Sequence, residues 1–128
     1  MTSFEELCDR VGKFNAARDW GQFHTPKNLA MAICGEAGEL AAEMQWLSPA
    51  EIELQLADEG FRESLAAEAA DVLLYLVSFS RACGFDLARA ALDKLQVNET
   101  RYPVNLSKGS SAKYSRLLAS DDSSSPGA

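Results

Sequence analysis

Two pairs of acidic residues stand at the same three-residue spacing in two segments with helical patterns. Glu36 and Glu39 belong to "GEAGELAAEM", and Glu68 and Asp71 belong to "ESLAAEAADVLLYLVSF". At about 100° of rotation per residue, Glu68 projects within about 20° of the apolar stripe that contains Tyr75, so it faces inward rather than toward water. By the same arithmetic, Glu36 faces the apolar side of its own segment. The sequence thus places acid pairs where a helix bundle normally has apolar residues.

Converging carboxylates of this kind are typical of a metal site. Ionised carboxylates are costly to bury, and like charges in a cluster raise each other's pKa values unless a cation neutralises them. Mg²⁺ and Mn²⁺ prefer oxygen ligands, and helix bundles build such sites from facing helices. Zinc and di-iron centres are disfavoured, because His24 is the only histidine and no Glu-x-x-His motif occurs. We therefore predict a Mg²⁺ site, with Mn²⁺ as an alternative ion, although any single acid here would be typical of a solvated surface.

A further helical segment carries residues that suit phosphate and a nucleoside. Lys94, Asn98 and Arg101 fall within an arc of about 60° on this helix. Lys and Arg bind phosphate, and an Asn amide can bind a base edge or a sugar hydroxyl. Alone, such a trio is common on solvated faces, but beside a metal site it indicates a phosphate ligand.

Aromatic residues gather around the loop "DWGQFHTPKN" and the end of the helix that follows it. They are Trp20, Phe23 and Trp46. Aromatic faces can stack a nucleobase, or they can simply pack in a core. A metal, a phosphate and a flat ring together describe a nucleotide.

Five helices are expected to position these residues. They are predicted from apolar periodicity, N-caps and Gly or Pro stops over residues 4–18, 26–47, 49–59, 61–83 and 86–102. No alternation typical of β-strands and no glycine-rich phosphate loop occurs, so the predicted fold is all-α, a bundle of four to five helices. Residues 1–103 form the predicted helical domain. Residues 104–128 form a C-terminal tail, expected to be disordered toward its serine-rich end.

Composition excludes several classes of partner. The chain has 128 residues, enough for one compact domain, and a formal charge of −7. That charge argues against binding to a nucleic acid polymer, because no basic face is available to displace phosphate counterions. No run approaches the roughly 20 apolar residues of a membrane helix, and the N-terminus lacks a signal-peptide pattern. We expect no membrane contact and a cytoplasmic location.

The helix predicted over residues 61–83 is apolar all round its axis between Val72 and Val77. A helix in a small monomeric bundle should have one polar face exposed to solvent. Because this helix has none, a partner subunit is expected to cover Leu73, Leu74 and Val77. The alternative is that the short third helix or the tail covers this face within one chain. We predict a homo-oligomer, either a tetramer or a dimer.

Four stretches resemble the MazG-like family of all-α nucleoside triphosphate pyrophosphohydrolases, and within it the small dCTP pyrophosphatase type. They read "RDWGQFHTPKNL", "GEAGELAAEMQW", "EAADVLLYLV" and "KLQVNETRYPVNLSKGSSAKY". The two acid pairs, followed in order by the Lys-Asn-Arg trio, are far more specific than a single E-x-x-E motif.

The resemblance implies hydrolysis of a nucleoside triphosphate between the α- and β-phosphates, giving the monophosphate and pyrophosphate, as in house-cleaning of nucleotide pools. It implies that Mg²⁺ is held by four acids that are also the catalytic residues: Glu36, Glu39, Glu68 and Asp71. It implies that the phosphates lie near Lys94 and Arg101. The sugar and base are expected near Trp20, Trp46, Tyr75 and Asn98, and His24 lies in the matching loop near the pocket.

Two alternatives stay open. Relatives that prefer dCTP often carry a histidine on the first helix, where this chain has Val11. A second enzymatic interpretation therefore keeps the fold but changes the substrate to other deoxynucleotides, modified dCTP or a broad range. The non-enzymatic alternative is an acidic helical interaction module whose carboxylates only solvate a groove.

Overall fold

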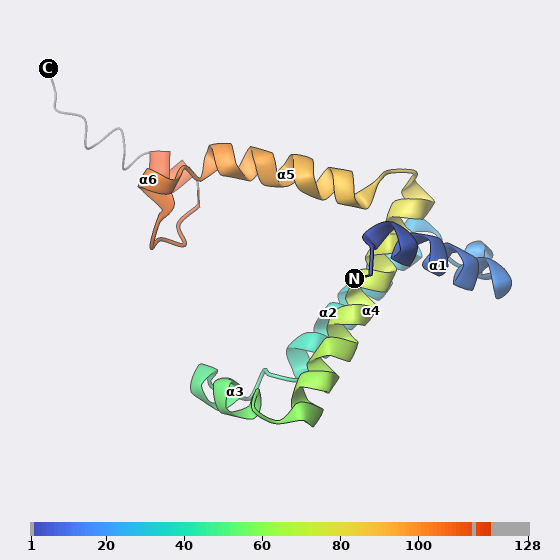
Figure 1. Ribbon diagram of the computed structural model, residues 1–128, viewed down its shortest axis with the longest axis horizontal. Helices are drawn as coiled ribbons and strands as arrows, with labels where there is room; N and C mark the ends of the chain where they lie inside the picture. The colour runs from blue at the N-terminus through green and yellow to red at the C-terminus, as the bar shows by residue number, and fades with distance from the viewer. Residues whose placement is uncertain (1, 114, 119–128) are drawn as a thin grey trace, which may run out of the picture. The chain divides into compact units, whose positions relative to one another are not determined.

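A computed structural model of the chain describes residues 2–113 and 115–118, and all regular secondary structure in this part is helical (Figure 1). In chain order the elements are α1 (Phe4–Ala17), the short 3₁₀ helix η1 (Trp20–Gln22), α2 (Pro26–Ala42), α3 (Pro49–Gln55), α4 (Glu59–Cys83), α5 (Leu87–Arg101) and α6 (Val104–Ser107). The predicted all-α fold is confirmed. None of the helices described combines the length and the apolar run that a membrane crossing requires.

The helices begin where the sequence supplies N-caps. Ser3 accepts a hydrogen bond from the backbone of Glu6 at the start of α1, and Thr25 does the same for α2, directly before Pro26. Ser48 and Glu51 form a reciprocal capping box at the start of α3. These side chains satisfy backbone N–H groups that have no partner within the helix, and this fixes the starting residue of each helix.

Three helix boundaries differ from the sequence prediction. Helix α3 ends at Gln55 rather than near residue 59. Helix α4 begins at Glu59 rather than residue 61, because the Asp58 carboxylate caps it by accepting from the Phe61 N–H at 2.9 Å. Helix α2 ends at Ala42 rather than near residue 47. Beyond Ala42 the chain continues in turns, with the Leu47 N–H donating to the carbonyl of Met44, three residues back. Such tighter bonding is common at helix ends and breaks the α-helical pattern.

The chain divides into two compact units, Met1–Leu87 and Ala88–Ala128. Within the first unit, α2 runs along α4, and α1 also packs against α4 (Figure 1). Leu29 of α2 and Val77 of α4 are almost completely buried there, at 1% and 0% exposure, and Val11 of α1 is buried as well. Helix α4 is therefore the element against which the other long helices of this unit are placed.

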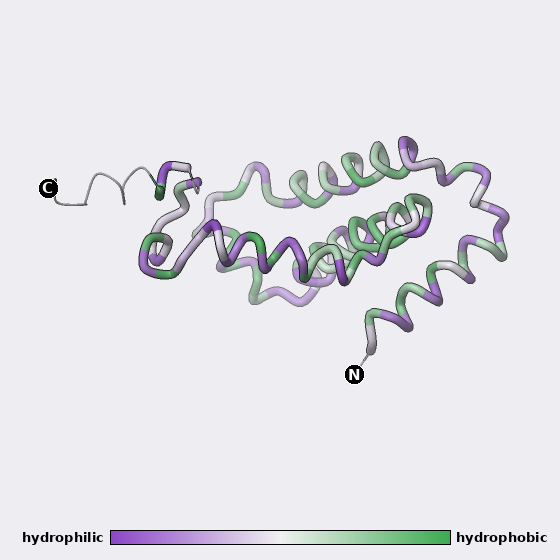
Figure 2. Tube along the Cα trace, turned by 90° about the horizontal axis from the view of Figure 1, so that it is seen from above, coloured by the Kyte–Doolittle hydropathy of each residue, from purple (hydrophilic) through white to green (hydrophobic). Residues whose placement is uncertain are grey.

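The second unit contains most of α5 and all of α6. Hydrophilic and hydrophobic residues alternate along the helices (Figure 2). On α5 the large apolar side chains Leu92, Leu95 and Val97 are exposed. The predicted disorder of the serine-rich end concerns residues 119–128, which lie outside the described residues.

Candidate active site

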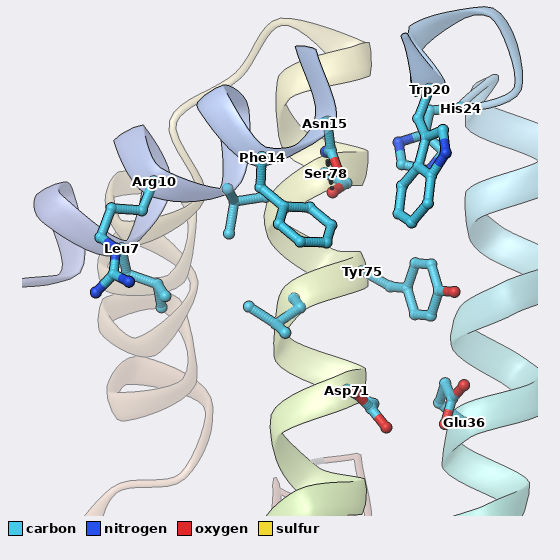
Figure 3. Close-up of a pocket in the computed structure, with 12 residues that line it drawn as sticks. Leu7, Arg10, Phe14, Asn15, Trp20, His24, Glu36, Asp71, Tyr75 and Ser78 are labelled. Atoms are coloured by element: carbon cyan, nitrogen blue, oxygen red, sulfur yellow. Dashed lines mark hydrogen bonds between the residues drawn. The ribbon is translucent and has the colours of Figure 1, made fainter. Parts of the chain in front are cut away.

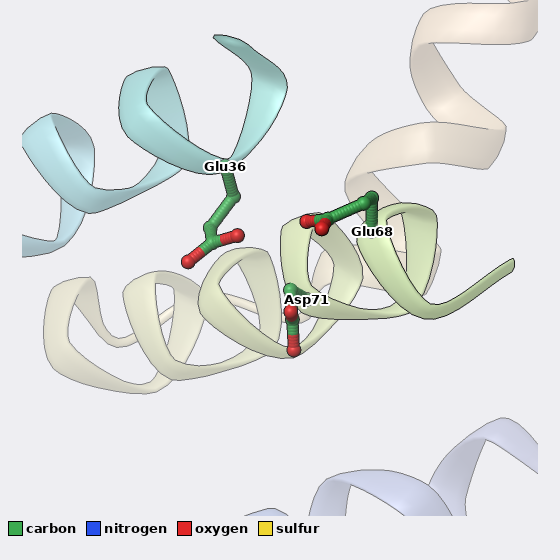
Figure 4. A group of neighbouring side chains, drawn as sticks. All are labelled: Glu36, Glu68 and Asp71. Carbon is green, nitrogen blue, oxygen red and sulfur yellow. The ribbon is translucent and has the colours of Figure 1, made fainter. Parts of the chain in front are cut away.

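Three of the four predicted metal ligands converge between α2 and α4. Glu36 extends from α2, and Glu68 and Asp71 extend from α4, one helical turn apart (Figure 4). One carboxylate oxygen of each residue lies within 4.8 Å of one from each of the others. Glu36 and Glu68 are half-buried and Asp71 is exposed. The close packing of α2 alongside α4 and the three-residue spacing on α4 bring the group together.

The electrostatics of this group centre on Glu68. Partial burial raises the pKa of its carboxyl, and the negative charges of Glu36, Glu39, Asp71 and Glu43 raise it further. Each of these causes disfavours the ionised form of Glu68. The arrangement is therefore unfavourable without a cation, as the sequence led us to expect.

Glu39, the fourth predicted ligand, is placed differently. It is exposed and is not one of the three acids whose oxygens converge, although its charge acts on Glu68. Glu43 also contributes to the negative field, and its Oε1 accepts a hydrogen bond from the Ser64 hydroxyl of α4 at 3.0 Å. This contact between the C-cap residue of α2 and α4 was not predicted from the sequence.

A pocket of about 530 Å³ opens beside the carboxylates (Figure 3). Glu36 and Asp71 line one part of it. The predicted substrate-binding residues Trp20, His24 and Tyr75 also line it. The structure therefore brings part of the predicted metal site and part of the predicted nucleoside site into one cavity of the first unit.

A chain of ring contacts holds the aromatic wall of this pocket. The rings of Phe14 and Trp20 meet edge to face with centroids 5.4 Å apart, and the rings of Trp20 and His24 are 5.9 Å apart. Arg18 lies over the Phe14 ring at 3.7 Å from its centroid. Between α1 and η1 the chain turns at Asp19, which has a left-handed φ of 52°. This turn places Trp20 against the last residues of α1.

Helix α1 forms a wall of the pocket, of which the sequence analysis singled out only Val11, through the family resemblance. Leu7, Arg10, Phe14 and Asn15 line it together with Val11. Asn15 donates a hydrogen bond from Nδ2 to the Ser78 Oγ of α4 at 3.0 Å. The apolar positions had been recognised as one face of a helix, but periodicity alone does not distinguish a face that packs from a face that lines a cavity.

Some predicted residues are not part of this cavity. Trp46 is 88% exposed in the turn after α2 and does not line the pocket. Lys94, Asn98 and Arg101 are all on α5, within the second unit, and share one helix as predicted. Their proposed roles toward phosphate and base stay predictions.

Comparisons with known proteins agree with this architecture. The model of the MazG-like family matches residues 31–117. The chain is 49% identical to dCTP pyrophosphatase 1 of Rattus norvegicus and 45% identical to that of Homo sapiens, in both cases over 90% of this chain and 68% of the relative. It is also similar to the crystal structure of a pyrophosphatase from Archaeoglobus fulgidus, with 35% identity, a TM-score of 0.70, and coverage of 80% of this chain and 94% of that chain. By sequence and by fold, the chain belongs to the MazG-like family.

Proposed function

We propose that the chain hydrolyses nucleoside triphosphates, dCTP or related nucleotides among them, to the monophosphate and pyrophosphate with the help of Mg²⁺. The enzyme class, a nucleoside triphosphate pyrophosphohydrolase, rests on the family and on relatives named as dCTP pyrophosphatases. The observation that supports the site is a group of three carboxylates, two of which, Glu36 and Asp71, line an aromatic-walled pocket.

The donor set suits a hard divalent cation. Glu36, Glu68 and Asp71 offer oxygens within 4.8 Å of one another. Burial and the surrounding negative charges raise the pKa of Glu68, and a cation would neutralise those charges. We assign these three acids as metal ligands and keep Glu39 as a fourth, outer member of the acid group. Mg²⁺, or Mn²⁺ in its place, supplies charge neutralisation on the phosphates and a more acidic water when bound.

The residues of the chain then have distinct tasks. The exposed carboxylate of Glu39 is suited to accept a hydrogen bond from the attacking water and to orient it in line with the bond that breaks. Trp20, His24 and Tyr75 hold the nucleoside through their rings. Lys94 and Arg101 are proposed to bind the phosphates, and Asn98 and Trp46 to contact the sugar and base, as the family resemblance implies.

We also propose that the protein acts as a homo-oligomer, a tetramer or a dimer. Among the described residues, four apolar side chains are buried, namely Val11, Leu29, Val77 and Leu117. Many large apolar side chains are exposed, among them Leu73 and Leu74 of α4 at 38% and 39%. Val77, which was expected to need a partner, is already covered within the chain. The other two remain candidates for a contact between subunits.

One experiment tests the enzymatic proposal against the interaction module. Pyrophosphate release is measured from a panel of canonical and modified deoxynucleoside triphosphates while Mg²⁺ is titrated from zero. We expect release that depends on Mg²⁺ and is highest for a subset of the panel. Absence of release at every Mg²⁺ concentration would favour the non-catalytic alternative, and equal rates across the panel would favour a broad range.

A further inference from the structure

The loop between α1 and α2 presents Trp20 and His24 to the pocket, and both side chains line it (Figure 3). Packing alone does not hold this loop, because Trp20 is 39% exposed and Phe23, which lies between the two in the chain, is 60% exposed. A loop that buries so little apolar surface depends on hydrogen bonds for its order. Two side-chain amides that do not themselves line the pocket provide such bonds.

Asn28, in the first turn of α2, provides one of them. Its Nδ2 donates to the carbonyl oxygen of Phe23 at 2.9 Å. Because a carbonyl oxygen can only accept, the amide nitrogen of Asn28 is the atom that faces it. On the other side of the same peptide group, the His24 N–H donates to the Trp20 carbonyl at 3.1 Å. The peptide group between Phe23 and His24 is planar, so the two bonds together fix the direction in which the chain enters His24.

Gln22 holds the start of the loop in a similar way. The loop turns at Asp19, which has a left-handed φ of 52°. Gln22 Nε2 donates to the Asp19 carbonyl at 3.0 Å and to the Asp19 carboxylate oxygen Oδ2 at 3.3 Å. The turn that precedes Trp20 is therefore held by a side-chain amide as well, and the aromatic wall of the pocket lies between these two supports.

We infer that Asn28 is a positioning residue for the nucleoside, which holds the peptide before His24 so that the aromatic wall is in place before a nucleotide binds. This inference rests on the proposed function, because it presumes a nucleotide in the pocket. If the wall had to be ordered during binding, the affinity for the ground state and for the transition state would fall alike. Loss of the Asn28 bond should therefore raise KM and leave kcat nearly unchanged.

Asn28→Asp removes the donor and keeps the size of the side chain. A carboxylate cannot donate to the Phe23 carbonyl, but in the first turn of α2 it interacts favourably with the helix dipole, so the helix itself should not be weakened. With Mg²⁺ and the preferred nucleotide of the panel, we expect KM to rise about fivefold, the effect of one hydrogen bond, and kcat to stay within about twofold of the wild-type value.

Two further variants separate the lost donor from the added charge. Asn28→Ala removes the donor without adding a charge and should raise KM to a similar extent. Lys27→Gln changes the net charge by the same amount at the neighbouring exposed position but keeps the Asn28 amide, so its KM should stay close to that of the wild type.

Three results would overturn the inference. The first is an unchanged KM in Asn28→Ala, because the charge would then explain any effect of Asn28→Asp. The second is a rise of KM in Lys27→Gln as large as in Asn28→Ala. The third is a fall in kcat that accounts for the whole loss of kcat/KM, as a general disturbance of the site would produce.

The order of the aromatic wall can also be measured without a nucleotide. In a Trp46→Phe background, Trp20 is the remaining tryptophan of the chain, and quenching of its fluorescence by acrylamide reports access to its ring. Adding Asn28→Ala should raise the quenching constant while the helical circular dichroism spectrum is kept. Equal quenching with and without Asn28→Ala would refute the role of Asn28, whereas a lack of hydrolysis by the wild-type chain would refute the proposed function.

Discussion

At the scale of single residues, the proposed metal ligand Glu68 is where we expect function and stability to conflict most directly. Its carboxylate is half-buried and lies among four other acids, so its pKa is raised. A cation would turn this unfavourable charge into a ligand set. The same carboxylate should therefore be required for activity and should destabilise the folded protein when no metal is bound, as functional sites often do.

Glu68→Gln separates these two effects. We expect the variant to keep its helical circular dichroism spectrum and to lose Mg²⁺-dependent pyrophosphate release, because the amide has similar size but no charge for the cation. Its melting temperature without metal should rise, since one repelling charge is gone. Glu63→Gln, on the exposed side of the same helix, is the matched control and should change neither quantity. Wild-type turnover in Glu68→Gln would refute the metal assignment.

The pH dependence of stability should carry the signature of the same residue. Because the pKa of Glu68 is raised in the folded protein, the folded state binds this proton more tightly than the unfolded chain does. The associated stabilisation is fully present below the ordinary carboxyl pKa and is lost as the pH rises through the raised value. Melting temperatures of metal-free wild-type protein should therefore fall over this window more than those of Glu68→Gln. Parallel curves for the two proteins would contradict the expectation.

At the scale of helices, the contact of α1 with α4 depends on a residue without a side chain. A Cβ atom at Gly12 would meet the guanidinium of Arg81, which reaches across from α4 and donates to the Cys8 carbonyl at 3.5 Å. At Gly35 of α2, by contrast, nothing lies within 4 Å of such an atom. The absence of a side chain at Gly12 thus leaves space for a side chain of α4, whereas no neighbour in the described structure requires a glycine at position 35.

Alanine substitutions should reveal this difference. Gly35→Ala is expected to stabilise the protein by about 1 kcal/mol through helix propensity. Gly12→Ala should gain less, because the Arg81 guanidinium must move and gives up its contact with α1. Urea denaturation of both variants measures the two free energies of unfolding. Equal gains at the two positions would show that the contact of Arg81 contributes nothing.

Features that depend on neighbouring residues in the chain could be predicted from the sequence, whereas features that depend on packing between helices could not. Ser3, Thr25 and Ser48 marked helix starts correctly, since a cap is a bond between residues three apart. Rotation about a helix axis placed Glu36 and Glu68 on facing sides. It could not show that Glu39 lies outside the converging group or that Trp46 is exposed, because both depend on where α2 ends and on what packs against it.

At the scale of the whole molecule, the scarcity of buried apolar side chains favours association. Leu73 is a better probe of this than Leu74, because Leu74 lines the pocket. Leu73→Glu should lower the molecular mass measured by light scattering, since an unpaired charge would lie in the subunit contact. If the wild-type protein already scatters as a single chain of 13.9 kDa at micromolar concentration, the proposed oligomer is excluded.

Binding of the proposed cation by the converging acids would also link the lifetime of the protein to its supply of metal. A ligand that binds the folded state alone lowers the population of open, protease-accessible chains in proportion to its saturation. Glu36 and Glu68 belong to different helices, so a shared cation would hold α2 to α4 against their repulsion. Depletion of Mg²⁺ would then lower the amount of the enzyme in a cell as well as its catalytic rate. The lower amount of enzyme would persist after the catalytic rate had recovered.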